Sequence, residues 1–184
     1  MTDTVTVHSF PIVIEKEDAM QQARRKGGPL GRLFLRGQSV YELRLHFVEY
    51  FILTFEVVHT PNFISRTFFG ERGQKTQYCR VLANGSTGGA AWAEELPDTI
   101  EEHMLPEANI QTSQFSLEHM TSRGKSLVLR VLRRRIGGMP QVTLKKTESV
   151  YRPFYVALYG QAIEGKKQRY IPIAADGWGT HRTF

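Results

Sequence analysis

The stretch EYFILTFE, residues 49–56, decides the expected fold because it is rich in aromatic and β-branched residues. Such a composition is typical of a largely buried β-strand. A similar stretch, RPFYVALY, occupies residues 152–159. Downstream of each, VLANG at residues 81–85 matches IAADG at residues 173–177, which gives a second strand and an Asn-Gly or Asp-Gly turn. The sequence therefore predicts two related halves, each containing a β-hairpin.

A helical segment precedes each hairpin. Residues 15–26 begin with acidic and end with basic side chains, which complements a helix dipole, and the Gly-Gly-Pro sequence at 27–29 ends that helix. Residues 116–135 form the clearest helix of the chain, with Ser116 suited to the N-cap. Its expected apolar stripe contains Leu117, Met120, Leu127, Val131 and Leu132.

These elements predict an α+β fold, in which an antiparallel sheet is built from two similar helix-then-hairpin halves with the helices packed on one face. The first half spans residues 1–93 and has a long loop between its strands. An acidic connector spans residues 94–110, with a helical turn expected between Pro97 and Pro106. The second half spans residues 111–184.

The long apolar stretches exceed the ordinary length of one strand. Within residues 40–58 we therefore assign a strand only to the second part, 49–58. Residues 141–147 and 149–160 are predicted as two separate strands. Further strands are expected at residues 4–7, 77–83 and 168–175.

The end of the second hairpin, Asp-Gly-Trp-Gly at residues 176–179, carries a family resemblance. A helix followed by a bent hairpin that ends in such a small-residue stretch resembles the cystatin-like folds, and in particular the PepSY type of domain. The resemblance covers residues 15–88 and 116–179. It implies binding or regulation, and it brings no catalytic residues with it.

Charge is unevenly distributed along the chain, although the net charge is only +6. Residues 81–122 contain seven acidic side chains and no Lys or Arg. The other residues therefore carry 24 basic and 11 acidic side chains, a net charge of +13. Because such asymmetry bears on partners, we expect the acidic stretch 94–107 to face a basic surface of this chain or of a neighbouring copy.

The sequence contains none of the usual signs of a membrane or oxidising environment. The longest apolar-rich stretch, residues 43–58, is interrupted by charged side chains, so no membrane span is expected. Residues 1–9 lack the pattern of a secretory signal, unlike many PepSY-type proteins. Cys79 is the only cysteine, which excludes an intramolecular disulfide. The expected location is the cytoplasm.

The candidate binding residues lie mainly in the loop 62–74, which is the chief length difference between the halves. Aromatic side chains alternate with cations there, as in surfaces that stack bases and contact phosphates, or that anchor a protein partner. The basic end of the second helix is expected to extend this surface. The candidate site comprises Phe63, Arg66, Phe68, Phe69, Arg72, Lys75, Arg133, Arg134 and Arg135.

Other constellations favour structural roles. The glycine-rich stretch 84–89 is similar to an anion-binding loop, but it lacks a Lys and no helix follows it directly. Cys79 is expected to be buried in a strand and unreactive, and Asp176 to form a turn. None of the six His residues has a metal-ligand spacing, so no metal or cofactor is expected.

The leading hypothesis is a non-enzymatic binding or assembly module that acts on a protein partner or on a second copy of itself. The first alternative is a nucleic-acid-binding protein that uses the basic and aromatic surface, in keeping with an isoelectric point near 9.6. The second alternative is a small enzyme of unrecognised type. No motif in the sequence identifies the partner.

Overall fold

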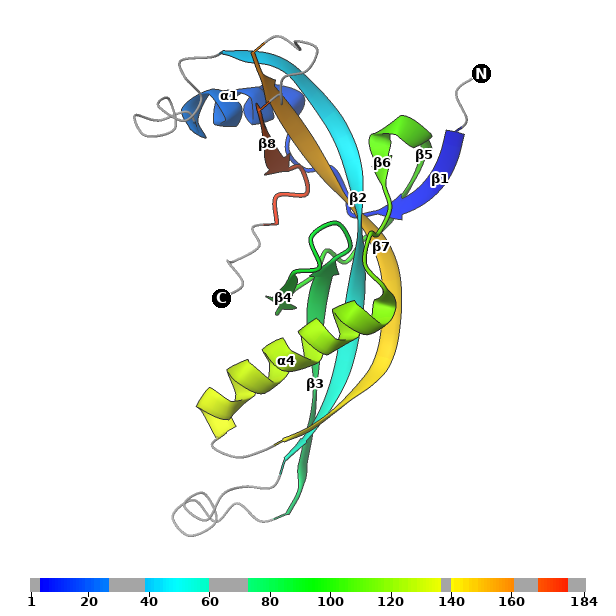
Figure 1. The fold of residues 1–184 in the computed structure, drawn as a ribbon, viewed down its shortest axis with the longest axis vertical. Helices are drawn as coiled ribbons and strands as arrows, with labels where there is room; N and C mark the ends of the chain where they lie inside the picture. Colours follow the sequence, from blue (N-terminus) through cyan, green and yellow to red (C-terminus); the bar gives the residue numbers. More distant parts are fainter. Residues whose placement is uncertain (1–3, 27–38, 60–72, 137–139, 161–168, 179–184) are drawn as a thin grey trace. The chain divides into compact units, whose positions relative to one another are not determined.

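The computed structural model of the chain describes residues 4–26, 39–59, 73–136, 140–160 and 169–178. In this part the chain is a mixed α and β protein, dominated by a large sheet of eight strands and accompanied by two α-helices (Figure 1). No helix in the described residues combines the length and apolarity needed to cross a bilayer. The elements are β1 (Thr4–Ser9), α1 (Lys16–Lys26), β2 (Val40–His59), β3 (Lys75–Asn84), β4 (Ala90–Ala93), β5 (Glu101–Pro106), the 3₁₀ helix η1 (Glu107–Asn109), β6 (Ile110–Gln111), α4 (Leu117–Ile136), β7 (Gln141–Tyr159) and β8 (Arg169–Ala174).

The strands follow the order β4-β3-β2-β7-β1-β5, with β6 paired to β2 and β8 paired to β7. Both predicted strand pairs are present and antiparallel. The β2–β3 pairing runs from Tyr50 opposite Asn84 to His59 opposite Lys75, and the β7–β8 pairing begins with Phe154 opposite Ala174. The strand predictions for residues 49–56 and 152–159 are thus confirmed.

Two strands are longer than predicted. Residues 40–58 lie in one continuous strand of 20 residues, and β7 continues for 19 residues where two strands were expected. The polar residues near the middle of β7 do not interrupt it, because they extend from the sheet and pair there. Lys145 Nζ lies 2.9 Å from Glu56 Oε1 on β2, and Lys146 Nζ lies 2.8 Å from Glu148 Oε1.

The prediction of a helical turn between Pro97 and Pro106 is wrong. Residues 101–106 form β5, whose antiparallel partner is β1, from Thr4 opposite Pro106 to Ser9 opposite Glu101. This pairing joins segments almost 100 residues apart, so local composition does not reveal it. The short helix η1 follows only after Pro106.

The chain divides into two compact units that interleave along the sequence. Unit 1 comprises Met1–Val48, Pro97–Gln111 and Tyr151–Gly179. Unit 2 comprises Glu49–Leu96, Thr112–Val150 and Thr180–Phe184. Each unit has its own helix and its own hydrophobic core.

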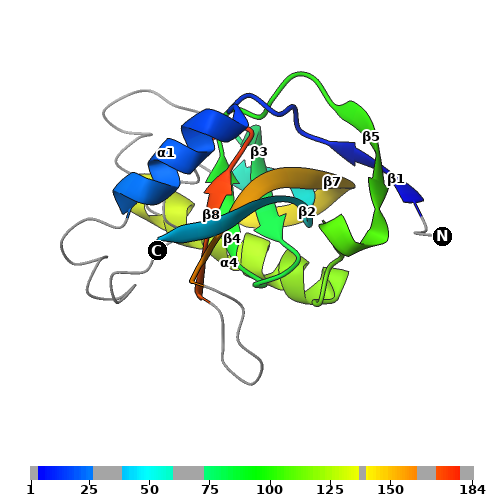
Figure 2. The ribbon, with the colours of Figure 1, turned by 90° about the horizontal axis from the view of Figure 1, so that it is seen from above.

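In unit 1, α1 packs against β7 and β8 (Figures 1 and 2). Two small residues, Ala19 and Ala23, are fully buried and let the helix approach the sheet closely. The Tyr159 hydroxyl donates a hydrogen bond of 2.7 Å to the carbonyl oxygen of Ala23, which fixes the helix on the strand. The core of this unit consists of Ala19, Ala23, Leu43, Tyr155, Ala157, Tyr159, Ile173 and Ala175.

In unit 2, α4 packs on β3 and β4, and its buried side chains share a core with residues of β2. Met120 and Leu132 are buried as predicted, but Leu117 is 44% exposed, because it lies in the first turn before the helix meets the sheet. Gly124 lies where a Cβ would come within 3.0 Å of Leu53 Cδ1, so its lack of a side chain permits the close approach. The core of this unit consists of Leu53, Phe55, Val57, Cys79, Val81, Ala83, Met120, Val128, Leu132 and Val142.

Candidate anion-binding site

A glycine-rich loop, residues 85–89, connects β3 to β4 in unit 2. Its conformation is set by Asn84, whose Oδ1 accepts hydrogen bonds from the backbone N–H groups of Ser86 (2.8 Å) and Thr87 (3.0 Å). The Thr87 hydroxyl accepts a further bond of 3.3 Å from the Gly89 N–H. A short polar side chain that folds back onto the following N–H groups is the usual way to build such a turn.

Gly88 is required at its position for two reasons. Its φ is +67°, in the left-handed region that favours glycine. A Cβ here would also lie 3.1 Å from His119 Nε2 and 3.2 Å from Phe115 Cε1. The loop therefore packs tightly against the rings at the start of α4.

The loop is held to the rest of unit 2 by a second set of contacts. The Gly85 N–H donates to the Glu49 carbonyl (3.0 Å), and the Gly85 carbonyl accepts from the Gln114 N–H (2.8 Å). The Glu49 carboxylate accepts hydrogen bonds of 2.8 Å from the Ser113 N–H and from the Ser149 hydroxyl. These contacts fix the loop relative to the segment that leads into α4.

The position at which α4 begins determines which of its side chains face the site. Ser116 Oγ accepts a hydrogen bond of 3.2 Å from the His119 N–H, as an N-cap side chain does, and this sets where the helix begins. Arg123, Leu127 and Arg130 then recur at intervals of four and three residues, which places them on one face of the helix. Arg123 and Arg130 are both exposed.

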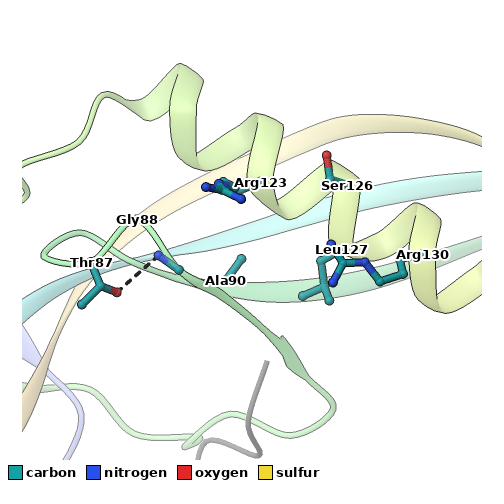
Figure 3. A pocket seen from close by; sticks show the side chains of 8 residues that line it. Thr87, Gly88, Ala90, Arg123, Ser126, Leu127 and Arg130 are labelled. Atoms are coloured by element: carbon teal, nitrogen blue, oxygen red, sulfur yellow. Dashed lines mark hydrogen bonds between the residues drawn. The ribbon is translucent and has the colours of Figure 1, made fainter. Parts of the chain in front are cut away.

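A cavity of about 440 Å³ lies between the glycine-rich loop and this face of α4 (Figure 3). Its volume falls within the range of small-ligand sites, roughly 300–1,000 Å³. Its lining residues are Thr87, Gly88, Gly89, Ala90, Arg123, Ser126, Leu127 and Arg130.

The lining has the chemistry of an anion site. It contains two guanidinium groups and two hydroxyl groups, and none of its described residues is acidic. Guanidinium groups bind phosphate and carboxylate through paired hydrogen bonds, and glycine backbone lets an anion approach closely. Figure 3 shows the Arg123 and Arg130 side chains leaving α4 on the side of the loop. The arrangement suits the holding of an oxygen-rich anion.

The sequence-predicted site residues are only partly within the described residues. Phe63, Arg66, Phe68, Phe69 and Arg72 lie outside them, as do the side chains of Arg134 and Arg135, although the latter two belong to α4. Lys75 is exposed at the start of β3, and Arg133 is exposed on α4. Neither of these two lines the cavity.

Sequence reasoning missed Arg123 and Arg130 as site residues. The glycine-rich loop has no cation beside it in the sequence, because its cations come from a helix more than 30 residues further along the chain. The usable signal is the spacing of seven residues between the two arginines, which puts both on one helix face at the edge of the apolar stripe.

Two other residues considered from the sequence have structural roles. Cys79 is buried, as predicted, and burial raises the pKa of its thiol to about 11. Asp176 forms a buried ion pair with Arg152, with Nε to Oδ2 at 2.6 Å, which occupies its carboxylate. Within the described ranges, no three His, Cys, Asp or Glu side chains are close enough to share a metal ion.

Among the residues that the structure describes, the cavity lining contains no carboxylate, His or Cys that would serve as a general base or nucleophile. Its cations and hydroxyl groups are suited to binding. Comparison of the chain with protein-family models, with curated proteins and with solved structures finds no match.

Proposed function

We propose that this chain is a non-enzymatic binding module that holds a phosphate-bearing partner in the cavity between the glycine-rich loop and α4. One observation carries the proposal: Arg123 and Arg130 line the same cavity as Gly88 and Gly89, and no acidic residue of the described part of the chain lines it with them. Two guanidinium groups on one side of a cavity create a positive potential inside it. An anion in the cavity therefore stabilises this arrangement.

A phosphate group fits the lining better than a carboxylate does. Phosphate presents several oxygen atoms in a tetrahedral arrangement, and here donors approach from two sides, from the helix and from the loop. Thr87 adds a hydroxyl group on the loop side. A carboxylate is planar, and a single guanidinium group can pair with both of its oxygen atoms.

We also propose that the fold arose by duplication, so that its two halves are related, as the sequence repeat predicts. This part of the proposal is supported by two similar contacts, one in each hairpin. The Asn84 amide donates to the Tyr50 hydroxyl at 2.7 Å, and the Arg152 guanidinium donates to the Asp176 carboxylate at 2.6 Å. Tyr50 and Arg152 are both buried residues of a long strand, and each bonds to the Asn or Asp residue at the turn that ends its hairpin. In both turns, Oδ1 of that Asn or Asp accepts a hydrogen bond from the backbone N–H two residues later.

Under this proposal, each helix covers the hairpin of the other half. The core contacts of α1 lie mainly with β7 and β8, and those of α4 lie mainly with β2 and β3. The resemblance to cystatin-like and PepSY-like helix-hairpin domains would then apply to α1 together with the β7–β8 hairpin, and to α4 together with the β2–β3 hairpin. Each such domain is a binding scaffold in this account.

The leading hypothesis from the sequence, a protein partner or a second copy bound by the loop 62–74, stays a prediction. That loop lies outside the described residues. It is compatible with the anion site, because one module can hold a phosphate-bearing group and a protein surface in different places.

The proposed function is tested by titrating the protein with inorganic pyrophosphate while its backbone amide resonances are recorded by NMR. We expect the largest shifts at Thr87, Gly88 and Gly89 and along the Arg123–Arg130 face of α4. Shifts confined to other parts of the chain, or no saturable shift at millimolar pyrophosphate, would overturn the proposal.

A further inference from the structure

The basic surface of α4 extends beyond the cavity. Glu118 is the only acidic residue of the helix, whereas six basic residues follow it within the same element. Arg133 is exposed and lies three residues after Arg130, on the same side of the helix. Arg123 to Arg133 spans ten residues, or about 15 Å along the helix axis. This stripe of Arg123, Arg130 and Arg133 is too long for one phosphate group to contact.

We infer that the partner is a single-stranded nucleic acid, whose phosphodiester backbone follows this arginine stripe and places one phosphate in the cavity. The inference rests on the proposed function and names the class of its ligand. A nucleic-acid backbone presents a regular series of negative charges, which is what a row of cations at several positions along a helix matches. A flexible single strand can also bend a phosphate into the cavity, whereas a stiff duplex resists such bending.

A pair of aromatic rings next to the cavity supports the same ligand. The rings of Phe115 and His119 are stacked, with centroids 4.9 Å apart, and both residues are partly exposed. Phe115 Cε1 lies 3.2 Å from the Cβ position of Gly88, a residue that lines the cavity. A base attached to a phosphate in the cavity is therefore within reach of these rings. Proteins that bind single strands combine a basic groove with aromatic stacking in this way.

An anionic membrane is a poorer match for the same stripe. Basic helices that lie on membranes insert an apolar face among the lipids. In α4 the apolar face is already used, because Met120, Val128 and Leu132 are buried in the core of unit 2. The helix could therefore interact with a membrane only through its charged side chains.

The test is fluorescence anisotropy with a fluorescein-labelled oligothymidylate, compared among the wild type, Arg133→Gln and Lys125→Gln. Lys125 is the matched control, because it is an exposed cation of the same helix but lies about 160° around it from Arg123. With three phosphate contacts, raising NaCl from about 50 mM to about 200 mM lowers the wild-type affinity on the order of 20-fold. Arg133→Gln should reduce the slope of log K against log salt by about 0.7, and Lys125→Gln should leave it nearly unchanged.

Pyrophosphate and vesicles separate the remaining outcomes. Arg133→Gln should leave pyrophosphate affinity unchanged, because Arg133 does not line the cavity. If pyrophosphate binds at the cavity but the oligonucleotide does not, the inference fails and the proposed function stands. If the oligonucleotide binds through Arg133 but pyrophosphate does not bind, the cavity proposal fails. Tighter binding to phosphatidylserine vesicles than to the oligonucleotide, or equal slopes for the two variants, overturns the nucleic-acid inference.

Discussion

Arg152 and Asp176 form a buried, bidentate ion pair that joins β7 to the turn after β8. Arg152 Nε lies 2.6 Å from Asp176 Oδ2, and Nη2 lies 2.9 Å from Oδ1. The guanidinium also donates to the Trp178 carbonyl at 2.8 Å and lies 5.2 Å from the centroid of the Trp178 ring. Only about 1% of the Arg152 side chain and none of the Asp176 carboxylate is exposed, so each charge depends on the other for its solvation.

Removing one partner of this pair should strongly destabilise the protein. Asp176→Asn leaves a buried guanidinium without its counter-charge, which costs about 3–5 kcal/mol of unfolding free energy. Urea denaturation of the wild type and the variant measures this difference. The matched control is Glu42→Gln, which breaks the exposed Arg44–Glu42 pair of 2.8 Å and should leave the unfolding midpoint unchanged. Equal midpoints for both variants would show that the Arg152–Asp176 pair adds no stability.

Gly88→Ala should impair both the loop and the anion site. The alanine must adopt a positive φ, at a cost of about 1–2 kcal/mol, and its Cβ would crowd His119 and Phe115. Gly73→Ala separates the two effects, because Gly73 has a φ of +93° but no atom of the described residues within 4 Å of its Cβ position. We expect both variants to lose stability in urea denaturation, and only Gly88→Ala to lose pyrophosphate binding. Unchanged pyrophosphate binding by Gly88→Ala would contradict the placement of the anion next to this loop.

Cys79 should be unreactive and should make stability depend on pH in the alkaline range. Burial raises its pKa from 9.0 to about 11, so the folded state keeps the thiol proton at a pH where the unfolded chain has lost it. The contribution of Cys79 to stability is therefore full below about pH 9 and decreases as the pH rises towards 11. Cys79→Val should flatten this part of the curve of unfolding free energy against pH. Labelling of the native wild type by a thiol reagent as fast as that of the unfolded chain would contradict the buried thiol.

The loop 62–74 is predicted from the sequence to bind a protein partner or a second copy of the chain. Replacing Phe68 and Phe69 together with Ala should leave the urea midpoint nearly unchanged and weaken self-association by about tenfold or more, because burying each ring at an interface contributes about 1.5–3 kcal/mol. Sedimentation velocity over a concentration series measures the association. Unfolding of the double variant would place the rings in the core, and a wild type that is monomeric at all concentrations would exclude self-association.

Much of the fold could be predicted from local sequence. The helices at 16–26 and 117–136 were recognisable from their capping and charge pattern, and the strand at 49–56 from its aromatic and β-branched residues. Residues 101–106 were not recognisable as a strand, because they are acidic and their partner, β1, lies almost 100 residues earlier in the chain. Strand pairing over such a separation depends on tertiary structure and leaves no local pattern.

Less of the candidate site than of the fold could be predicted from the sequence. The loop 85–89 is similar in sequence to an anion-binding loop, but the neighbouring sequence supplies no cations for it. They come from Arg123 and Arg130, which only the packing of α4 brings to the loop. Gly124 makes that packing possible, because its lack of a side chain lets α4 approach Leu53 closely.

The central claim is that Arg123 and Arg130 hold a phosphate-bearing group against the glycine-rich loop. The most direct test is calorimetric titration with pyrophosphate of the wild type, of Arg123→Gln/Arg130→Gln, and of the control Lys125→Gln. Hydrogen bonds to charged groups contribute about 1.5–3 kcal/mol each, so the double variant should bind at least about 100-fold more weakly. Lys125→Gln should bind as the wild type does. Equal affinities for the wild type and the double variant would contradict the claim.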